Sequence, residues 1–180
     1  MIKYKFIHLF ILVFLIGLFA CQEDEAPRPF FYGNYNLQSI SMDGAMDLNN
    51  DGEASTDFFS QVEDGAGNPG NRLTLLSLEM DEMQFALFYP NVLTVQSGIP
   101  IIRFPVENQS LTVVFAEETN AFAVLRMQPL VPQAGQITAI NLIDQLTIDV
   151  EVSKSLYDFS TAEWLDTLVT YRFVRGLISA

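Results

Sequence analysis

The stretch from residue 47 to residue 57, DLNNDGEASTD, holds the side chains of this chain whose types and spacing are best suited to chemistry. Oxygen-bearing side chains stand at alternate positions, Asp47, Asn49 and Asp51, and a glycine follows directly. A loop with oxygen ligands at its first, third and fifth positions and a glycine at the sixth can wrap around a calcium ion. The sequence therefore predicts a Ca²⁺ site whose candidate ligands are Asp47, Asn49, Asp51, Glu53 and Asp57.

The second half of this loop departs from the calcium-binding pattern. A bidentate carboxylate is expected at the twelfth position, but Phe58 stands there and Asp57 comes one residue early. Aspartate, asparagine and glycine are also the residues of ordinary polar turns, although carboxylates held close together without a counterion repel one another. Two interpretations stay open: a Ca²⁺ site with a dissociation constant of ~10⁻⁴–10⁻³ M, or a solvated loop without metal.

Histidine and cysteine occur only once each, near the N-terminus, as His8 and Cys21. The rest of the sequence therefore has no imidazole for a Ser-His-Asp arrangement and no thiolate or imidazole ligand for zinc. Carboxylates, amides and hydroxyls remain, and these suit oxygen-liking cations or a glycosidase that works with two carboxylates. We single out no catalytic residue and expect a protein that is not an enzyme.

Residues 1–20 have the features of a lipoprotein signal peptide. Two lysines precede an apolar run, 6–20, that is shorter than the about 20 residues of a transmembrane helix. The run ends in Leu-Phe-Ala-Cys, which resembles the lipobox of bacterial lipoproteins. This resemblance implies cleavage before Cys21 and attachment of acyl chains, such as palmitate, to that cysteine.

Residues 21–32 form an expected flexible, acidic tether. Glu23, Asp24 and Glu25 resemble the export signal of surface lipoproteins of Bacteroidetes. The resemblance implies a protein anchored by its N-terminal lipid in the bacterial outer membrane, with the folded domain at the cell surface.

The charge balance limits the partners of that domain. The chain has 22 acidic and 9 basic residues, and its formal net charge of −13 becomes −15 if Lys3 and Lys5 leave with the signal peptide. A chain this acidic repels the phosphates of nucleic acids, so we expect no nucleic-acid partner. Its hydrophobic content of 49% is too high for disorder, which requires low hydrophobicity together with charge.

Alternation of polar and apolar residues indicates the elements that must position the acidic loop. In residues 145–152 every second side chain is apolar, as a half-buried strand requires. A Ser-Thr-Ala-Glu pattern at residues 160–163 predicts one short helix near residues 161–166. Further strands are expected at residues 35–41, 73–80, 83–89, 93–97, 101–106, 111–116, 121–128, 136–142 and 169–174. We predict one all-β domain, residues 33–180, built as a closed barrel or a β-sandwich.

Several short motifs together resemble the lipocalin-like lipoproteins of Bacteroidetes. They are the lipobox, the acidic tether, Gly33-Asn34-Tyr35 before the first strand, the 47–58 loop, and Thr170-Tyr171-Arg172 in the last strand. The resemblance implies an up-and-down antiparallel barrel of about eight strands. It also implies that an arginine of the last strand, Arg172 or Arg175, lies over Tyr35, which replaces the tryptophan of lipocalins.

Three functional hypotheses follow. The first is a non-enzymatic binding or accessory domain that captures an unidentified small apolar or glycan ligand within a barrel. The alternative is a structural or adhesion module whose surface is stiffened by a calcium loop. A two-carboxylate glycosidase is the third, and it requires two acidic side chains about 5–10 Å apart across a cleft.

Overall fold

The computed structural model describes residues 29–62 and 75–176. The predicted signal peptide, the lipidation site Cys21 and most of the tether lie outside the described residues, as does the end of the domain after residue 176. Within the described ranges, no helix has the length and apolar character needed to cross a membrane.

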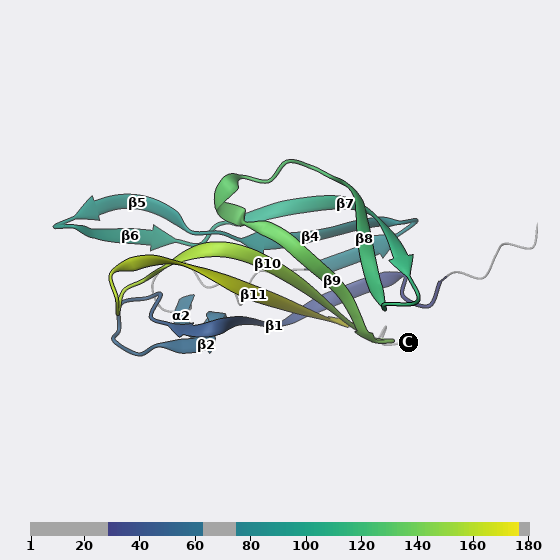
Figure 1. Ribbon diagram of the computed structural model, residues 1–180, viewed down its shortest axis with the longest axis horizontal. Helices are drawn as coiled ribbons and strands as arrows, with labels where there is room; N and C mark the ends of the chain where they lie inside the picture. Colours follow the sequence, from purple (N-terminus) through teal and green to yellow (C-terminus); the bar gives the residue numbers. More distant parts are fainter. Residues whose placement is uncertain (1–28, 63–74, 177–180) are drawn as a thin grey trace, which may run out of the picture.

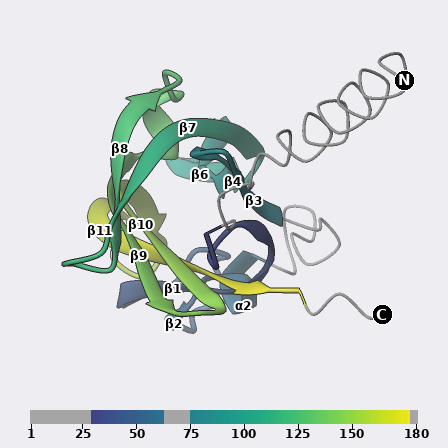
Figure 2. The same cartoon turned by 90° about the vertical axis from the view of Figure 1, so that its right-hand side faces the viewer.

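Eight antiparallel strands form a closed barrel (Figures 1 and 2), which confirms the predicted fold class. In order around the barrel they are β1 (Gly33–Met46), β3 (Leu75–Glu79), β4 (Glu82–Phe88), β7 (Val106–Ala116), β8 (Ala121–Met127), β9 (Gln136–Asp144), β10 (Thr147–Asp158) and β11 (Glu163–Arg175). Strand β11 pairs back onto β1 and closes the barrel. A ninth strand, β2 (Ser55–Asp57), pairs with β1.

Three further elements stand outside this barrel. Strands β5 (Asn91–Gln96) and β6 (Ile99–Arg103) form a separate two-stranded hairpin. Helix α2 (Phe58–Val62) follows β2, and a 3₁₀ turn, η2 (Pro132–Ala134), lies between β8 and β9. The connections between most neighbouring strands are tight turns, as expected for an up-and-down barrel.

The barrel interior is filled by side chains from the inward-facing positions of each strand. On β10, Val150, Val152 and Leu156 are fully buried, while Ser153 between them is exposed. The largest fully buried side chains of the described chain include Tyr35, Tyr171, Phe88, Phe173 and Phe58. An eight-stranded barrel has an interior just wide enough for such side chains to fill.

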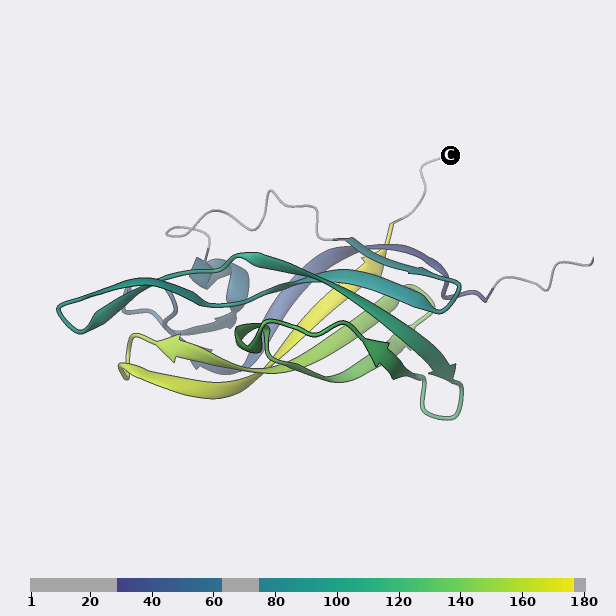
Figure 3. The same ribbon diagram turned by 90° about the horizontal axis from the view of Figure 1, so that it is seen from above.

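The two ends of the barrel differ in what they carry. The first and last described residues, Pro29 and Gly176, lie at one end, which we call the proximal end. The β5–β6 hairpin, helix α2 and the turn between β10 and β11 lie together at the opposite, distal end in both side views (Figures 1 and 3).

The short helix is not where the sequence predicted it. Residues 161–166 contain a turn and the start of β11, and the single short α-helix of the described residues is α2. The hydroxyls of Ser160 and Thr161 donate to the carboxylate of Asp158, instead of capping a helix. Helix α2 itself starts at a capping residue, because the Asp57 carboxylate accepts the N–H of Phe59 at 3.0 Å.

Arg175 is the arginine of the last strand that lies over Tyr35. Its guanidinium carbon is 5.9 Å from the ring centroid, and its nitrogens donate to the carbonyls of Phe30 and Tyr32. A side chain on Gly33 would place a Cβ only 2.8 Å from Arg175 Nη2, and Gly33 also has a φ of +154°. A side chain at this position would therefore strain the backbone and displace the Arg175 guanidinium.

Candidate functional site

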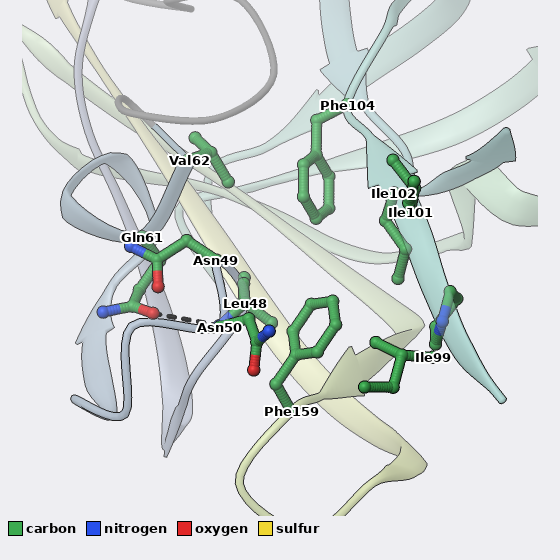
Figure 4. A pocket seen from close by; sticks show the side chains of 11 residues that line it. Leu48, Asn49, Asn50, Gln61, Val62, Ile99, Ile101, Ile102, Phe104 and Phe159 are labelled. Carbon is green, nitrogen blue, oxygen red and sulfur yellow. Dashed lines mark hydrogen bonds between the residues drawn. The ribbon is translucent and has the colours of Figure 1, made fainter. Parts of the chain in front are cut away.

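A hollow of about 230 Å³ lies at the distal end, between the β5–β6 hairpin and the rim of the barrel (Figure 4). It is lined by Leu48, Asn49, Asn50, Gln61, Val62, Ile99, Pro100, Ile101, Ile102, Phe104 and Phe159. We call it the distal pocket. Its walls are mainly aliphatic and aromatic, with three amide side chains and, among these described lining residues, no carboxylate.

The hairpin wall of the distal pocket stands apart from the barrel. Strands β5 and β6 pair only with each other, and they are joined by Ser97 and Gly98, both at positive φ, as in a tight hairpin turn. Ile99 and Ile101 line the pocket and are 49% and 44% exposed. They are therefore available to an apolar ligand.

The opposite wall is the first part of the acidic loop, and hydrogen bonds fix its shape. The buried carboxylate of Asp47 accepts the N–H of Asn50 at 2.7 Å and the N–H of Gly52 at 3.0 Å. Gln61 of α2 accepts the N–H of Leu48 at 2.9 Å, and its amide donates to the Glu53 carbonyl at 2.9 Å. Helix α2 and the loop therefore form one wall.

The turn between β10 and β11 joins this loop to the barrel. The N–H of Asp47 donates to Asp158 Oδ1 at 2.9 Å, and the N–H of Phe159 donates to the Asp47 carbonyl at 2.8 Å. This reciprocal pair places the Phe159 ring against the pocket, opposite Ile99 (Figure 4).

An aromatic row leads from the pocket to the only tryptophan of the chain. The Phe159 and Tyr157 rings are 5.0 Å apart, and the Tyr157 and Trp164 rings are 5.5 Å apart. Trp164 is 46% exposed. A ligand that moves Phe159 can therefore change the fluorescence of Trp164.

The loop oxygens that the sequence proposed for calcium mainly accept hydrogen bonds from the loop itself. Asp51 accepts from the N–H of Glu53 and from the Asn49 amide, at 2.7 and 2.9 Å. Asp57 caps α2, while Asp47 holds the backbone of the loop. In the described part of the chain, no three acidic, histidine or cysteine side chains are placed to hold a metal. Calcium binding by this loop stays a prediction.

Calcium binding can be tested by thermal unfolding. With a dissociation constant of ~10⁻³ M, calcium at about ten times that concentration would stabilise the domain by about 1.4 kcal/mol. We expect the Tm to rise by about 3–6 °C relative to chelator, and Asp51→Asn to abolish the rise. Magnesium at the same ionic strength is the control. An equal Tm in calcium and in chelator would leave the solvated loop as the correct interpretation.

A second, larger hollow of about 830 Å³ lies at the proximal end. It extends from Pro29 along the start of β1 to Arg175 and Gly176. The Arg175 guanidinium already donates hydrogen bonds to the carbonyls of Phe30 and Tyr32. Two charged residues, Glu79 and Arg175, line this hollow, whereas none of the described residues that line the distal pocket is charged. The distal pocket is therefore the better suited of the two to an apolar ligand.

Sequence reasoning missed a buried lysine in the barrel interior. Lys154 is 4% exposed, and its Nζ donates to the Phe88 carbonyl at 2.6 Å and to the Tyr171 hydroxyl at 2.8 Å. No carboxylate of the described residues pairs with it. Burial lowers the pKa of Lys154 to about 7 and raises the pKa of Tyr171. The signal was present, because Lys154 continues the inward series of Val152 and Leu156.

The carboxylate pairs that a glycosidase could use lie in exposed turns. Asp81 and Glu82 are at the β3–β4 turn, where Asp81 accepts the Tyr32 hydroxyl and Glu82 accepts Thr112. Glu117 and Glu118 are exposed in the β7–β8 turn. Neither pair lines one of the two hollows described above.

Comparison of this chain with protein-family models, with curated proteins and with solved structures finds no match. The likeness to lipocalin-like lipoproteins therefore stays a prediction.

Proposed function

We propose that this protein is a lipid-anchored, non-enzymatic binding domain that captures a small apolar ligand in the distal pocket. The observation that carries the proposal is a hollow with apolar walls, partly exposed isoleucines and, among the described lining residues, no carboxylate. Ligand sites are typically concave and mostly apolar, with a few polar groups that orient the ligand. An apolar cavity of about 150 Å³ can already hold benzene, so 230 Å³ is sufficient for a small ligand.

Among the polar groups of the pocket, one side chain is available to hydrogen-bond a ligand and so to orient it. Gln61 and Asn49 are engaged with the loop backbone and with Asp51. The side-chain amide of Asn50 has no hydrogen-bond partner among the described residues, and Asn50 is exposed at the rim. The ligand that fits best is therefore apolar with one hydroxyl or carbonyl group, rather than a glycan with polar groups on every side.

Binding can be measured with N-phenyl-1-naphthylamine, a neutral apolar dye, and the single Trp164 provides a second signal. We expect Ile99→Ser with Ile101→Ser to weaken dye binding about tenfold, because each lost aliphatic contact removes about 0.7 kcal/mol. Both residues are exposed, so folding is not at risk.

The matched control is Val92→Ser with Leu93→Ser, on the same hairpin but outside the pocket lining. This control should bind the dye as the unaltered protein does. Equal weakening by both double variants, or no saturable dye binding, would contradict the proposed pocket.

A further inference from the structure

The apolar surface at the distal end is longer than the distal pocket. On β5, Val92, Leu93 and Val95 are 41%, 49% and 61% exposed, and none of them lines the pocket. The hairpin from Asn91 to Arg103 has a single charged residue, Arg103. A small ligand in the pocket would leave the apolar side chains of β5 in water, so an extended partner covers this end better.

The backbone of the hairpin also favours an extended partner. A two-stranded hairpin is only marginally stable in water unless another surface covers it. Its outer edges have no strand partner in the described part of the chain, and unpaired edges can bind an added strand. Pro100 removes one N–H donor from β6, whereas β5 contains no proline and keeps all its donors.

The negative charge next to the pocket favours a partner with positive charge. Asp51, Glu53 and Asp57 are exposed on the loop whose Asn49 and Asn50 line the pocket. The described residues contain five basic side chains, and three of them are engaged within the molecule. Lys154 is buried, Arg172 pairs with Asp149, and Arg175 binds backbone carbonyls. A partner with basic side chains therefore meets attraction at this end, and a second copy of this acidic chain meets repulsion.

We propose that the distal end docks an extended, cationic peptide segment with apolar side chains. One apolar side chain fills the distal pocket, others cover β5, and the basic side chains lie toward the acidic loop. This inference rests on the proposed function, because it uses the same pocket, and it names the class of molecule that carries the apolar group.

The test is fluorescence anisotropy with labelled short peptides, in the presence of chelator so that calcium does not neutralise the loop. A peptide of alternating lysine and leucine should bind at least tenfold more tightly than one of alternating glutamate and leucine, or one of alternating lysine and serine. Its affinity should fall as salt is added, because exposed charges are screened.

Three double variants, one of them a control, test the contacts. Glu53→Gln with Asp57→Asn should weaken the lysine–leucine peptide about fivefold, and asparagine preserves the cap of α2. Glu117→Gln with Glu118→Gln, at the opposite end of the barrel (Figure 1), removes the same charge and should change nothing. Val92→Ser with Leu93→Ser should weaken the peptide but not the naphthylamine dye.

The outcomes separate the two proposals. Saturable dye binding with equal affinities for the lysine–leucine and glutamate–leucine peptides would overturn the peptide inference and leave the pocket in place. Equal weakening by both pairs of acidic substitutions would overturn it as well, because the attraction would then come from net charge alone. Loss of dye binding would contradict the proposed function itself.

Discussion

Replacing Lys154 by methionine is expected to stabilise the domain at pH 6 by about 1–4 kcal/mol, as large as the range found when buried ion pairs are replaced by well-packed apolar side chains. At that pH the lysine is mainly charged although it lies in the barrel interior, and no described carboxylate compensates for the lost hydration. Methionine fits a similar volume. It also leaves no orphaned polar group, because the Tyr171 hydroxyl still donates to the Phe88 carbonyl and accepts the Phe88 N–H.

The pH dependence identifies Lys154 as the cause. Its pKa is about 7 in the folded state, against 10.5 for an ordinary lysine, so the unfolded chain binds more protons between these values. Stability therefore rises with pH across this window and is lowest below pH 7, where both states are charged. At about 1.36 kcal/mol per pH unit, the free energy of unfolding should rise by about 3 kcal/mol between pH 7 and about pH 9.5.

Urea unfolding at a series of pH values between 6 and about 9.5 measures both effects. Lys154→Met should remove the rise with pH, while Arg103→Met, which removes an exposed cation from the hairpin, should leave it unchanged. A wild-type protein whose stability stays flat in this window, or a methionine variant that is less stable at pH 6, would contradict this account of Lys154.

The barrel was predictable because each strand repeats one simple pattern. Alternating residues such as Ile148, Val150 and Val152 identify a strand with one buried face, and eight such strands with short turns favour an antiparallel barrel. Leu146, which continues the alternation in the sequence, lies in the β9–β10 turn and is 46% exposed. The true strands are often longer than predicted: β1 extends to Met46 and β11 begins at Glu163. Pairing with a neighbouring strand continues past the residues whose alternation is visible.

The position of the helix was not predictable from the capping pattern. Ser160 and Thr161 have the side chains of a helix start, but the nearby carboxylate of Asp158 takes both hydroxyls. Trp164 and Leu165 then pair with Tyr157 and Leu156 across the β10–β11 hairpin. Tertiary pairing thus overrides a local signal.

The pocket was not visible in the sequence because its walls come from distant segments. The acidic loop is evident in the sequence and does border the pocket, whereas nothing in the sequence singles out Gln61 or Ile99 as site residues. Their roles depend on contacts such as that of Gln61 with Leu48 and on the packing of a hairpin against the barrel rim. Neither contact has a local sequence signature.

Asp158→Ala is expected to destabilise the domain by about 2–4 kcal/mol and to abolish dye binding in the distal pocket. The side chain is 3% exposed and accepts the N–H of Asp47 together with the hydroxyls of Ser160 and Thr161. Removing a buried acceptor leaves donors unpaired, which costs about 1–3 kcal/mol for each group that water cannot reach. The loop and Phe159 would separate, and these form two sides of the pocket.

Lowering the pH should reproduce the loss of stability and of dye binding in the unaltered protein. Burial alone would raise the pKa of Asp158, but hydrogen bonds from Ser160, the Asp47 N–H and Thr161 outweigh it and lower the pKa. A carboxyl group with a lowered folded-state pKa contributes stability above its unfolded pKa of about 3.9, and this contribution disappears as pH falls through the folded value. Asp158→Asn should therefore remove part of the acid sensitivity.

Asp149 provides the matched control, because it is also a buried aspartate of β10 but pairs with Arg172 on the outer face of the barrel. Asp149→Asn should lower the free energy of unfolding and leave the dye affinity unchanged. Urea unfolding and dye titration of both variants show whether Asp158 is needed for the pocket as well as for stability. If Asp158→Ala lowers stability but keeps full dye affinity, the loop does not need Asp158 to hold its wall of the pocket. In that case the contact between the Phe159 N–H and the Asp47 carbonyl is sufficient.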